Sequence, residues 1–237
     1  MHRSAKRLAS LLACAAVPVM LVAGCSGSDS SNSSDGSSDA PSTSTKPSAT
    51  VAAAKYKKLP NPCQAFSKDT LGKLVPKTKN KGGEPGTSDD ATSHATCSWD
   101  SSDENGVDGT QFRWLDIGFQ RYDSDPNPAV GTGEKRATDF YAKQVANAKG
   151  TEGAKKVQTA KTDSTGDEST AITYDITKDK TPFKNTTIVA RAANIVVTVN
   201  YNGAGMAGAD TPKGADLLKA AQAAAKEAVA AAVKANG

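Results

Sequence analysis

The chain has few of the residues from which metal centres and acid–base catalytic sites are usually built. Among its 237 residues only two are histidine and four are cysteine, and aromatic residues make up 5%. Zinc sites need several cysteine or histidine ligands, and histidine is the most frequent general base. We therefore expect no metal site and no cofactor, and we predict that the protein is not an enzyme.

Long apolar runs are also scarce, and the single example ends at a cysteine. The basic start MHRSAKR precedes 17 mostly apolar residues, 8–24, whereas a transmembrane helix needs about 20. The run closes with Val22-Ala23-Gly24-Cys25, which resembles the lipobox of bacterial lipoproteins. The resemblance implies a signal peptide over residues 1–24 and fatty acyl chains, such as palmitate, on Cys25. The alternatives are an ordinary secretory signal with an incidental cysteine and an uncleaved anchor.

An excess of positive charge is absent once the leader is set aside. The formal charge of +4 includes Arg3, Lys6 and Arg7 of the leader, which leaves 26 basic against 25 acidic residues in the remainder. A nucleic-acid-binding domain normally carries a clear basic patch. We expect no nucleic-acid partner.

Residues 25–58 read as a tether. The segment from 26 to 50 has 11 serines in 25 positions and almost no apolar side chain. Such a composition cannot bury enough surface to offset the entropy cost of ordering. We predict that this segment is a disordered linker between the lipid anchor and a folded domain, residues 59–237, at the extracytoplasmic face of the cell membrane.

Two cysteines are left for the predicted domain, Cys63 and Cys97. In an exported, oxidising setting the simplest expectation is one disulfide, which contributes about 3–4 kcal/mol in the chain-entropy model. Two buried free thiols or a redox pair are the alternatives, although the chain has no CxxC motif.

The apolar patterning of the domain predicts an α+β fold, a curved antiparallel sheet with helices packed on it. Period-2 alternation predicts strands, a hairpin joined near residues 192–194 among them, and helical spacing or high alanine content predicts helices. In the last helix we expect a thin apolar stripe of Leu218, Ala221, Ala225, Val229 and Val233. The expected helices cover residues 62–75, 134–149 and 214–235, and the expected strands cover 96–100, 111–122, 155–160, 169–177, 185–192 and 193–202.

The domain also resembles the actinobacterial cell-envelope lipoproteins that share a domain of unknown function. The resemblance is carried by Pro62-Cys63, by Cys97-Ser98-Trp99 and by the turn Gly166-Asp167-Glu168-Ser169, where alanine is common in place of Ser169. It implies a secreted, lipid-anchored α+β domain with paired cysteines. It implies no chemistry, because the activity of that family is not established.

Three aromatic residues are candidates for a ligand-binding surface. Leu115, Ile117 and Phe119 alternate onto one face of a strand and form a credible core face. Phe112, Trp114 and Tyr122 are then left to face outward or into a groove, where aromatic surface marks contact sites. The alternative is that a helix or loop covers them.

We expect a lipid-anchored binding or sensing domain that engages a small molecule, an envelope polymer or a protein. His94, the single histidine outside the leader, is expected in a polar loop without a catalytic role. A second hypothesis is an envelope hydrolase or transferase that uses carboxylates such as Asp116 and Asp175, which requires two acidic groups within about 5–10 Å. A third is a structural accessory subunit of an envelope complex.

Overall fold

The structure, a computed structural model, describes residues 50–237. The predicted signal peptide, Cys25 and the tether up to residue 49 lie outside the described residues, so these assignments stay predictions. Within residues 50–237, no helix combines the length and the apolar character that crossing a bilayer requires.

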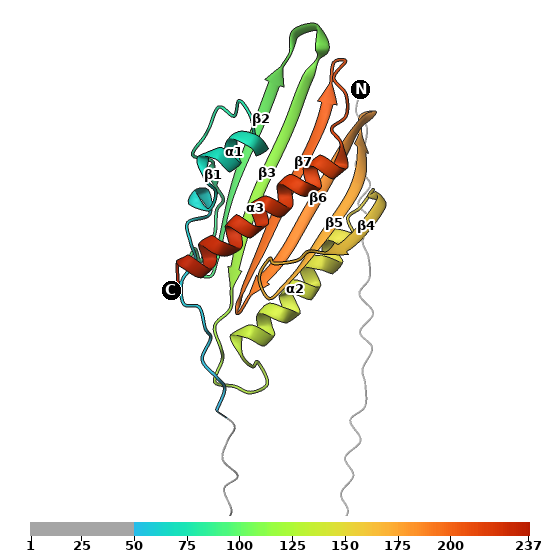
Figure 1. The fold of residues 1–237 in the computed structure, drawn as a ribbon. Coiled ribbons are helices and arrows are strands. Elements are labelled where there is room, and N and C mark those ends of the chain that lie inside the picture. The colour runs from blue at the N-terminus through green and yellow to red at the C-terminus, as the bar shows by residue number, and fades with distance from the viewer. Residues whose placement is uncertain (1–49) are drawn as a thin grey trace, which may run out of the picture. The chain divides into compact units, whose positions relative to one another are not determined.

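A single antiparallel sheet of seven strands organises the domain (Figure 1). Its order is β1-β2-β3-β7-β6-β5-β4, so the two long hairpins β2–β3 and β6–β7 lie side by side at its centre. This confirms the predicted α+β fold. The strands are β1 (Glu84–Pro85), β2 (His94–Glu104), β3 (Thr110–Arg121), β4 (Lys155–Lys161), β5 (Glu168–Lys178), β6 (Thr181–Ala192) and β7 (Ile195–Met206), and the helices are α1 (Lys68–Leu74), α2 (Gly133–Lys149) and α3 (Gly214–Lys234).

Two details differ from the sequence expectation. The first helix is divided into a 3-10 turn, η1 (Pro62–Gln64), and α1, because the Ser67 side chain caps a new helix by accepting from the backbone N–H of Thr70. The polar loop before β2 contains β1, whose two residues pair with Ser98 and Cys97. A strand of two residues is defined only by its pairing with β2, and it is too short to show an alternating pattern in the sequence.

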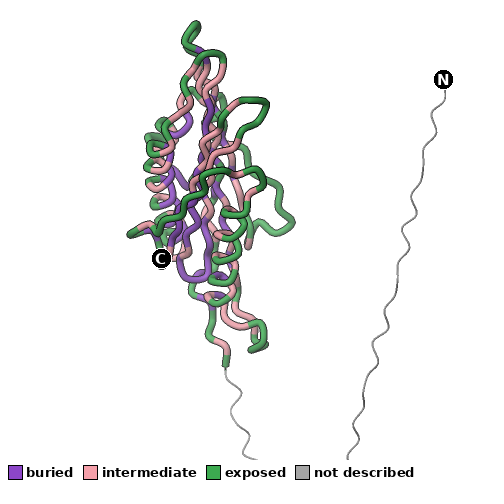
Figure 2. Tube along the Cα trace, turned by 90° about the vertical axis from the view of Figure 1, so that its right-hand side faces the viewer, coloured by how far each residue is buried: buried purple, intermediate pink, exposed green. Residues whose placement is uncertain are grey.

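One face of the sheet is covered by α3, which crosses it diagonally in Figure 1. The predicted core face of Leu115, Ile117 and Phe119 is confirmed, since each is at most 1% exposed. Figure 2 shows the buried residues gathered along the inner sides of the sheet and helices.

The helical stripe that covers this face was only partly predicted. Val233, expected in the stripe, is 44% exposed, and Leu218 is only partly buried. Because most of the true stripe is alanine, the helix axis can lie close to the sheet. The buried residues of α3 are Leu217, Ala221, Ala224, Ala225, Ala228, Val229 and Ala232.

The opposite face is covered by α2 over only part of its width. Ala137 of α2 is fully buried, together with Ile172, Val189 and Val196 from β5, β6 and β7. The helix therefore covers the β5–β6 side and one end of β7. The same face of β2, β3 and the rest of β7 carries mainly polar side chains that no helix within residues 50–237 covers.

Two further features fix the ends of the domain. The predicted disulfide is formed, joining Cys63 of η1 to Cys97 of β2 with an S–S distance of 2.06 Å. Asn194 is fully buried in the β6–β7 turn. Its side-chain oxygen accepts from the Tyr56 N–H at 2.7 Å, and its amide group donates to the Tyr56 and Tyr122 carbonyls, each at 2.8 Å. The chain thus joins the folded unit at the end of the sheet where β6 turns into β7.

Candidate ligand-binding site

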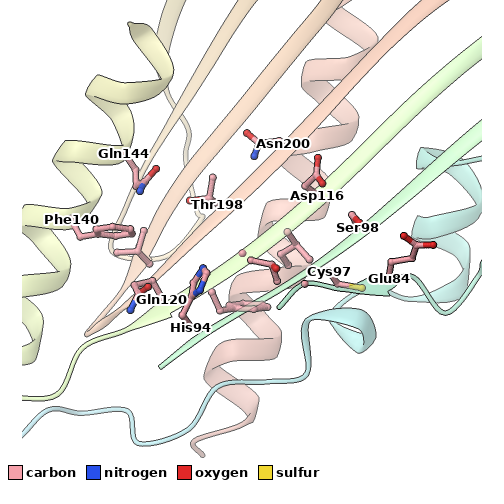
Figure 3. A pocket seen from close by; sticks show the side chains of 16 residues that line it. Glu84, His94, Cys97, Ser98, Asp116, Gln120, Phe140, Gln144, Thr198 and Asn200 are labelled. Atoms are coloured by element: carbon pink, nitrogen blue, oxygen red, sulfur yellow. The ribbon is translucent and has the colours of Figure 1, made fainter. Parts of the chain in front are cut away.

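The uncovered face contains a hollow of about 390 Å³ beside α2. Its floor is formed by β2, β3 and β7, and Phe140 and Gln144 of α2 form one wall (Figure 3). Glu84 of β1 and the neighbouring Gly86 lie at the other side. The hollow exists because α2 stops short of the β2 edge of the sheet.

The strand register places polar side chains in rows across this floor. Ser98 pairs with Asp116, and Asp116 pairs with Asn200, so three polar residues of neighbouring strands form one row. In the next row, Gly118 stands between Thr96 and Thr198. Because Gly118 has no side chain, it leaves space on the floor between the two threonines.

Asp116 is the ionisable group at the centre of the hollow. Its side chain is exposed in the hollow, and the surrounding walls raise the pKa of its carboxyl by desolvation. Within residues 50–237 no hydrogen bond or ion pair to it is formed. Its acceptor positions are therefore open to a ligand.

Asn200 supplies a donor beside this carboxylate. Its side-chain oxygen accepts a hydrogen bond from the Thr187 hydroxyl at 2.8 Å, which leaves the amide NH₂ group as the available part of the side chain. Figure 3 shows Asp116 and Asn200 on adjacent strands, with Ser98 on the far side of Asp116. The row thus offers both an acceptor and a donor.

An aromatic group lies farther along the same face. The rings of Phe112 and Trp114 are stacked with centroids 5.7 Å apart, and Phe183 of β6 lies 5.7 Å from Trp114. Trp114 and Phe183 line a second hollow of about 430 Å³, which shares Asp116 with the first. Phe112 and Trp114 are half-buried, and none of the helices in the described part of the chain covers them.

The third aromatic candidate is not part of this group. Tyr122 packs against Phe140 at 5.5 Å, under the start of α2, and Arg136 lies over its ring. The alternative of coverage by a helix is therefore correct for Tyr122. Sequence reasoning missed Phe183, which precedes the expected strand, although its alternation with Asn185 and Thr187 places it on the same face.

His94 does not complete a catalytic triad. It begins β2 instead of lying in a loop, and it borders the hollow. It is separated from Ser98 by four residues of one extended strand, about 13 Å at the rise of a strand. That distance is beyond the reach of the two side chains, so His94 is not placed to act on Ser98 as the histidine of a catalytic triad does.

The two carboxylates of the hydrolase hypothesis are not brought together. Asp116 faces the hollow, whereas Asp175 of β5 lies beside the start of α3 on the opposite face. Asp175 is bound by the Lys184 ammonium at 2.8 Å from both carboxylate oxygens. Their separation by the sheet removes the basis of that particular acid–base pair. Among residues 50–237, no three potential metal-binding side chains of the His, Cys, Asp or Glu type are grouped together.

Comparisons with known proteins give a family without an assigned activity. No curated protein matches the chain. Among solved structures it is similar to LpqN, described as involved in cell envelope biogenesis of Mycobacterium tuberculosis, with 11% identity over 61% of this chain and 82% of that one and a TM-score of 0.29. A likeness of this size supports no conclusion about the present chain. A family model described as "Protein of unknown function (DUF3558)" matches residues 20–231, and the chain therefore belongs to the DUF3558 family.

Proposed function

We propose that this protein is a lipid-anchored binding domain at the extracytoplasmic face of the cell membrane, and that its uncovered sheet face receives the ligand. The observation that carries the proposal is the hollow around Asp116. Polar groups, among them the carboxylate of Asp116 and the amide NH₂ group of Asn200, converge there on a floor of three strands, which is the arrangement by which proteins orient ligands.

The anchor part of the proposal is supported by the sequence and by the family match. The match begins at residue 20 and so includes Cys25 and the serine-rich segment as well as the folded domain. A diacylated cysteine with a further acyl chain supplies the two or more hydrophobic chains that stable anchoring needs.

The anchor is tested by replacing the cysteine. We expect Cys25→Ser to leave the leader uncleaved and to abolish the acyl mass that mass spectrometry detects on the wild-type membrane protein. Cys14→Ser, a cysteine inside the leader, is the matched control and should be processed normally. A Cys25→Ser protein that is still cleaved and still sediments with lipid would contradict the proposal.

The binding part is tested with the full-length protein in detergent. Soluble polysaccharide, lipid and protein fractions from the envelope of the source organism are added in turn, and NMR signals of the side-chain amides are followed. We expect at least one fraction to shift the amides of Asn200 and Gln144, which border the hollow, and to leave that of Asn236, bonded to Lys58 at the C-terminal end of the domain, unchanged. If no fraction shifts the first two signals, the proposed function is wrong.

A further inference from the structure

We propose that the ligand of this hollow is an uncharged saccharide chain that lies along β3 between Trp114 and Gln120. The inference rests on the proposed function and specifies the chemical class of its ligand. Three properties of the surface support it, namely its charge, its hydrogen-bonding groups and its aromatic end.

The charge of the lining disfavours an anion. Glu84 and Asp116 both line the first hollow, and none of the described residues that line it is lysine or arginine. The aromatic hollow has one lysine, Lys178, at its edge, and Asp116 lines that hollow too. A phosphate or carboxylate on the polar floor would therefore lose its hydration and meet two like charges with no cation beside it. Phosphorylated polymers, acidic sugars and anionic lipid headgroups fit poorly here.

The hydrogen-bonding groups disfavour a simple cation. A small cation requires a cluster of oxygen acceptors, yet Asn200 beside Asp116 has its oxygen engaged by Thr187 and presents its NH₂ group. The lining instead mixes a carboxylate acceptor, amide donors and hydroxyls that can do both. Sugar hydroxyls also act as donor and acceptor at once, so they match this mixture. The carboxylate is that of Asp116, the amides are those of Gln144 and Asn200, and the hydroxyls are those of Thr96, Ser98 and Thr198.

The same polar floor disfavours an acyl chain. An apolar chain in the hollow would strip water from several amide and hydroxyl groups without replacing their hydrogen bonds, at a cost of about 1–3 kcal/mol for each group. A sugar chain replaces those hydrogen bonds with its own hydroxyls.

The aromatic group completes the match. Each sugar ring has a face of C–H groups that packs on an aromatic ring, and Phe112, Trp114 and Phe183 provide such rings next to the polar floor. The two hollows meet at Asp116. From Trp114 to Gln120 the strand runs for about 20 Å, which suits several linked rings better than a single sugar.

The experiment titrates the full-length protein in detergent with defined tetrasaccharides. Four uncharged probes are used, made of glucose, mannose, galactose and N-acetylglucosamine, together with tetragalacturonate as the acidic probe and a glucosamine tetramer as the cationic one. Calorimetry gives the affinity. Tryptophan emission locates the contact, because Trp99 is only 4% exposed whereas Trp114 is half-buried at the hollow.

We expect at least one uncharged tetrasaccharide to bind, to change the tryptophan emission and to bind more tightly than its disaccharide. Asp116→Asn should weaken that binding by roughly tenfold, the effect of losing one hydrogen bond to a charged group. Asp139→Asn, an exposed carboxylate on the outer side of α2, is the matched control and should bind as the wild type does.

A second variant fills the hollow without removing any of its polar groups. A Cβ atom at Gly118 would lie 3.5 Å from the Thr96 methyl group, an ordinary contact, so Gly118→Leu directs its side chain into the hollow. We expect this variant to lose binding while its circular dichroism spectrum stays that of the folded protein. Asp116→Asn still tests the proposal if Gly118→Leu does not fold.

Several outcomes overturn the inference. It is wrong if only the acidic or the cationic probe binds, or if uncharged sugars bind equally to the wild type, Asp116→Asn and Gly118→Leu. It is also wrong if neither the uncharged probes nor the envelope polysaccharide fraction binds while the lipid or protein fraction shifts Asn200 and Gln144. In that last case the proposed function stands and the saccharide assignment alone fails.

Discussion

For Asp116, the sequence predicts the direction of the side chain, but only the structure shows the hollow around it. Its place between Leu115 and Ile117 predicts a side chain on the outer face of a strand, and that is where it lies. The hollow around it could not be predicted from the sequence. It depends on the absence of a side chain at Gly118 and on how far α2 extends across the sheet.

The polar neighbours of Asp116 are hidden in the sequence for a related reason. Thr96, Ser98, Thr198 and Asn200 occupy alternate strand positions that any solvent-exposed face would fill with polar residues. Only the register between three strands shows that they converge.

Replacing Asp116 gives a prediction about pH. The walls of the hollow partly desolvate this exposed carboxyl and raise its pKa, so the folded state disfavours the ionised form. The stability associated with the protonated group is fully present below the unfolded-state pKa, about 3.9, and is lost as the pH rises through the higher folded-state pKa. Because solvent reaches the side chain and screens the effect, Asp116→Asn should raise the Tm only slightly at pH 7 and change it little at pH 3.

Thermal unfolding followed by circular dichroism at the two pH values measures this effect. Asp100→Asn, an exposed aspartate on the neighbouring strand, is the control and should change the Tm little at either pH. A lower Tm for Asp116→Asn at pH 7 would show that the carboxylate is stabilised by the fold.

At the scale of elements, the alternation of apolar and polar residues predicted the strands better than alanine content predicted the buried face of α3. The β6–β7 hairpin turns at Ala193-Asn194, as its period-2 pattern predicts. The buried stripe of α3 was harder to identify because alanine occupies both its buried and its exposed positions. Hydropathy hardly distinguishes one alanine from another, so the contact with the sheet decides which are buried.

A pair of alanines tests this contact. Ala228 is fully buried against the sheet, whereas Ala230 is exposed on the same helix. We expect Ala228→Leu to lower the free energy of unfolding by about 1–3 kcal/mol, because the added atoms overfill the interface. Ala230→Leu should change it by less than about 0.5 kcal/mol. Urea denaturation measures both, and equal effects of the two substitutions would mean that α3 does not lie on the sheet by this face.

At the scale of the whole domain, one covalent bond joins the N-terminal segment to the sheet. The disulfide between Cys63 and Cys97 links residues 34 positions apart. Trp99 and Phe66 pack together beside it, with rings 5.6 Å apart. The sequence predicted this bond because residues 59–237 contain only two cysteines, whereas the packing around it depends on the fold.

Removing the bond should destabilise the domain without unfolding the sheet. The Cys63→Ala/Cys97→Ala double variant is expected to lose about 2–4 kcal/mol of unfolding free energy in urea. Reductant should lower the stability of the wild type and leave the double variant unaffected. If reductant has no effect on the wild type, the two thiols are not joined in the purified protein.

The place where the chain joins the folded unit also has a mechanical consequence. Asn194 holds Tyr56 at the β6–β7 turn, and Figure 1 shows the chain arriving at that end of the sheet. A pulling force on the N-terminal segment therefore acts lengthwise along β6 and β7, and many hydrogen bonds between the strands oppose it together. Traction on such a connection shears the sheet instead of peeling off an edge strand, so the domain should resist unfolding by a pull applied through its N-terminal segment.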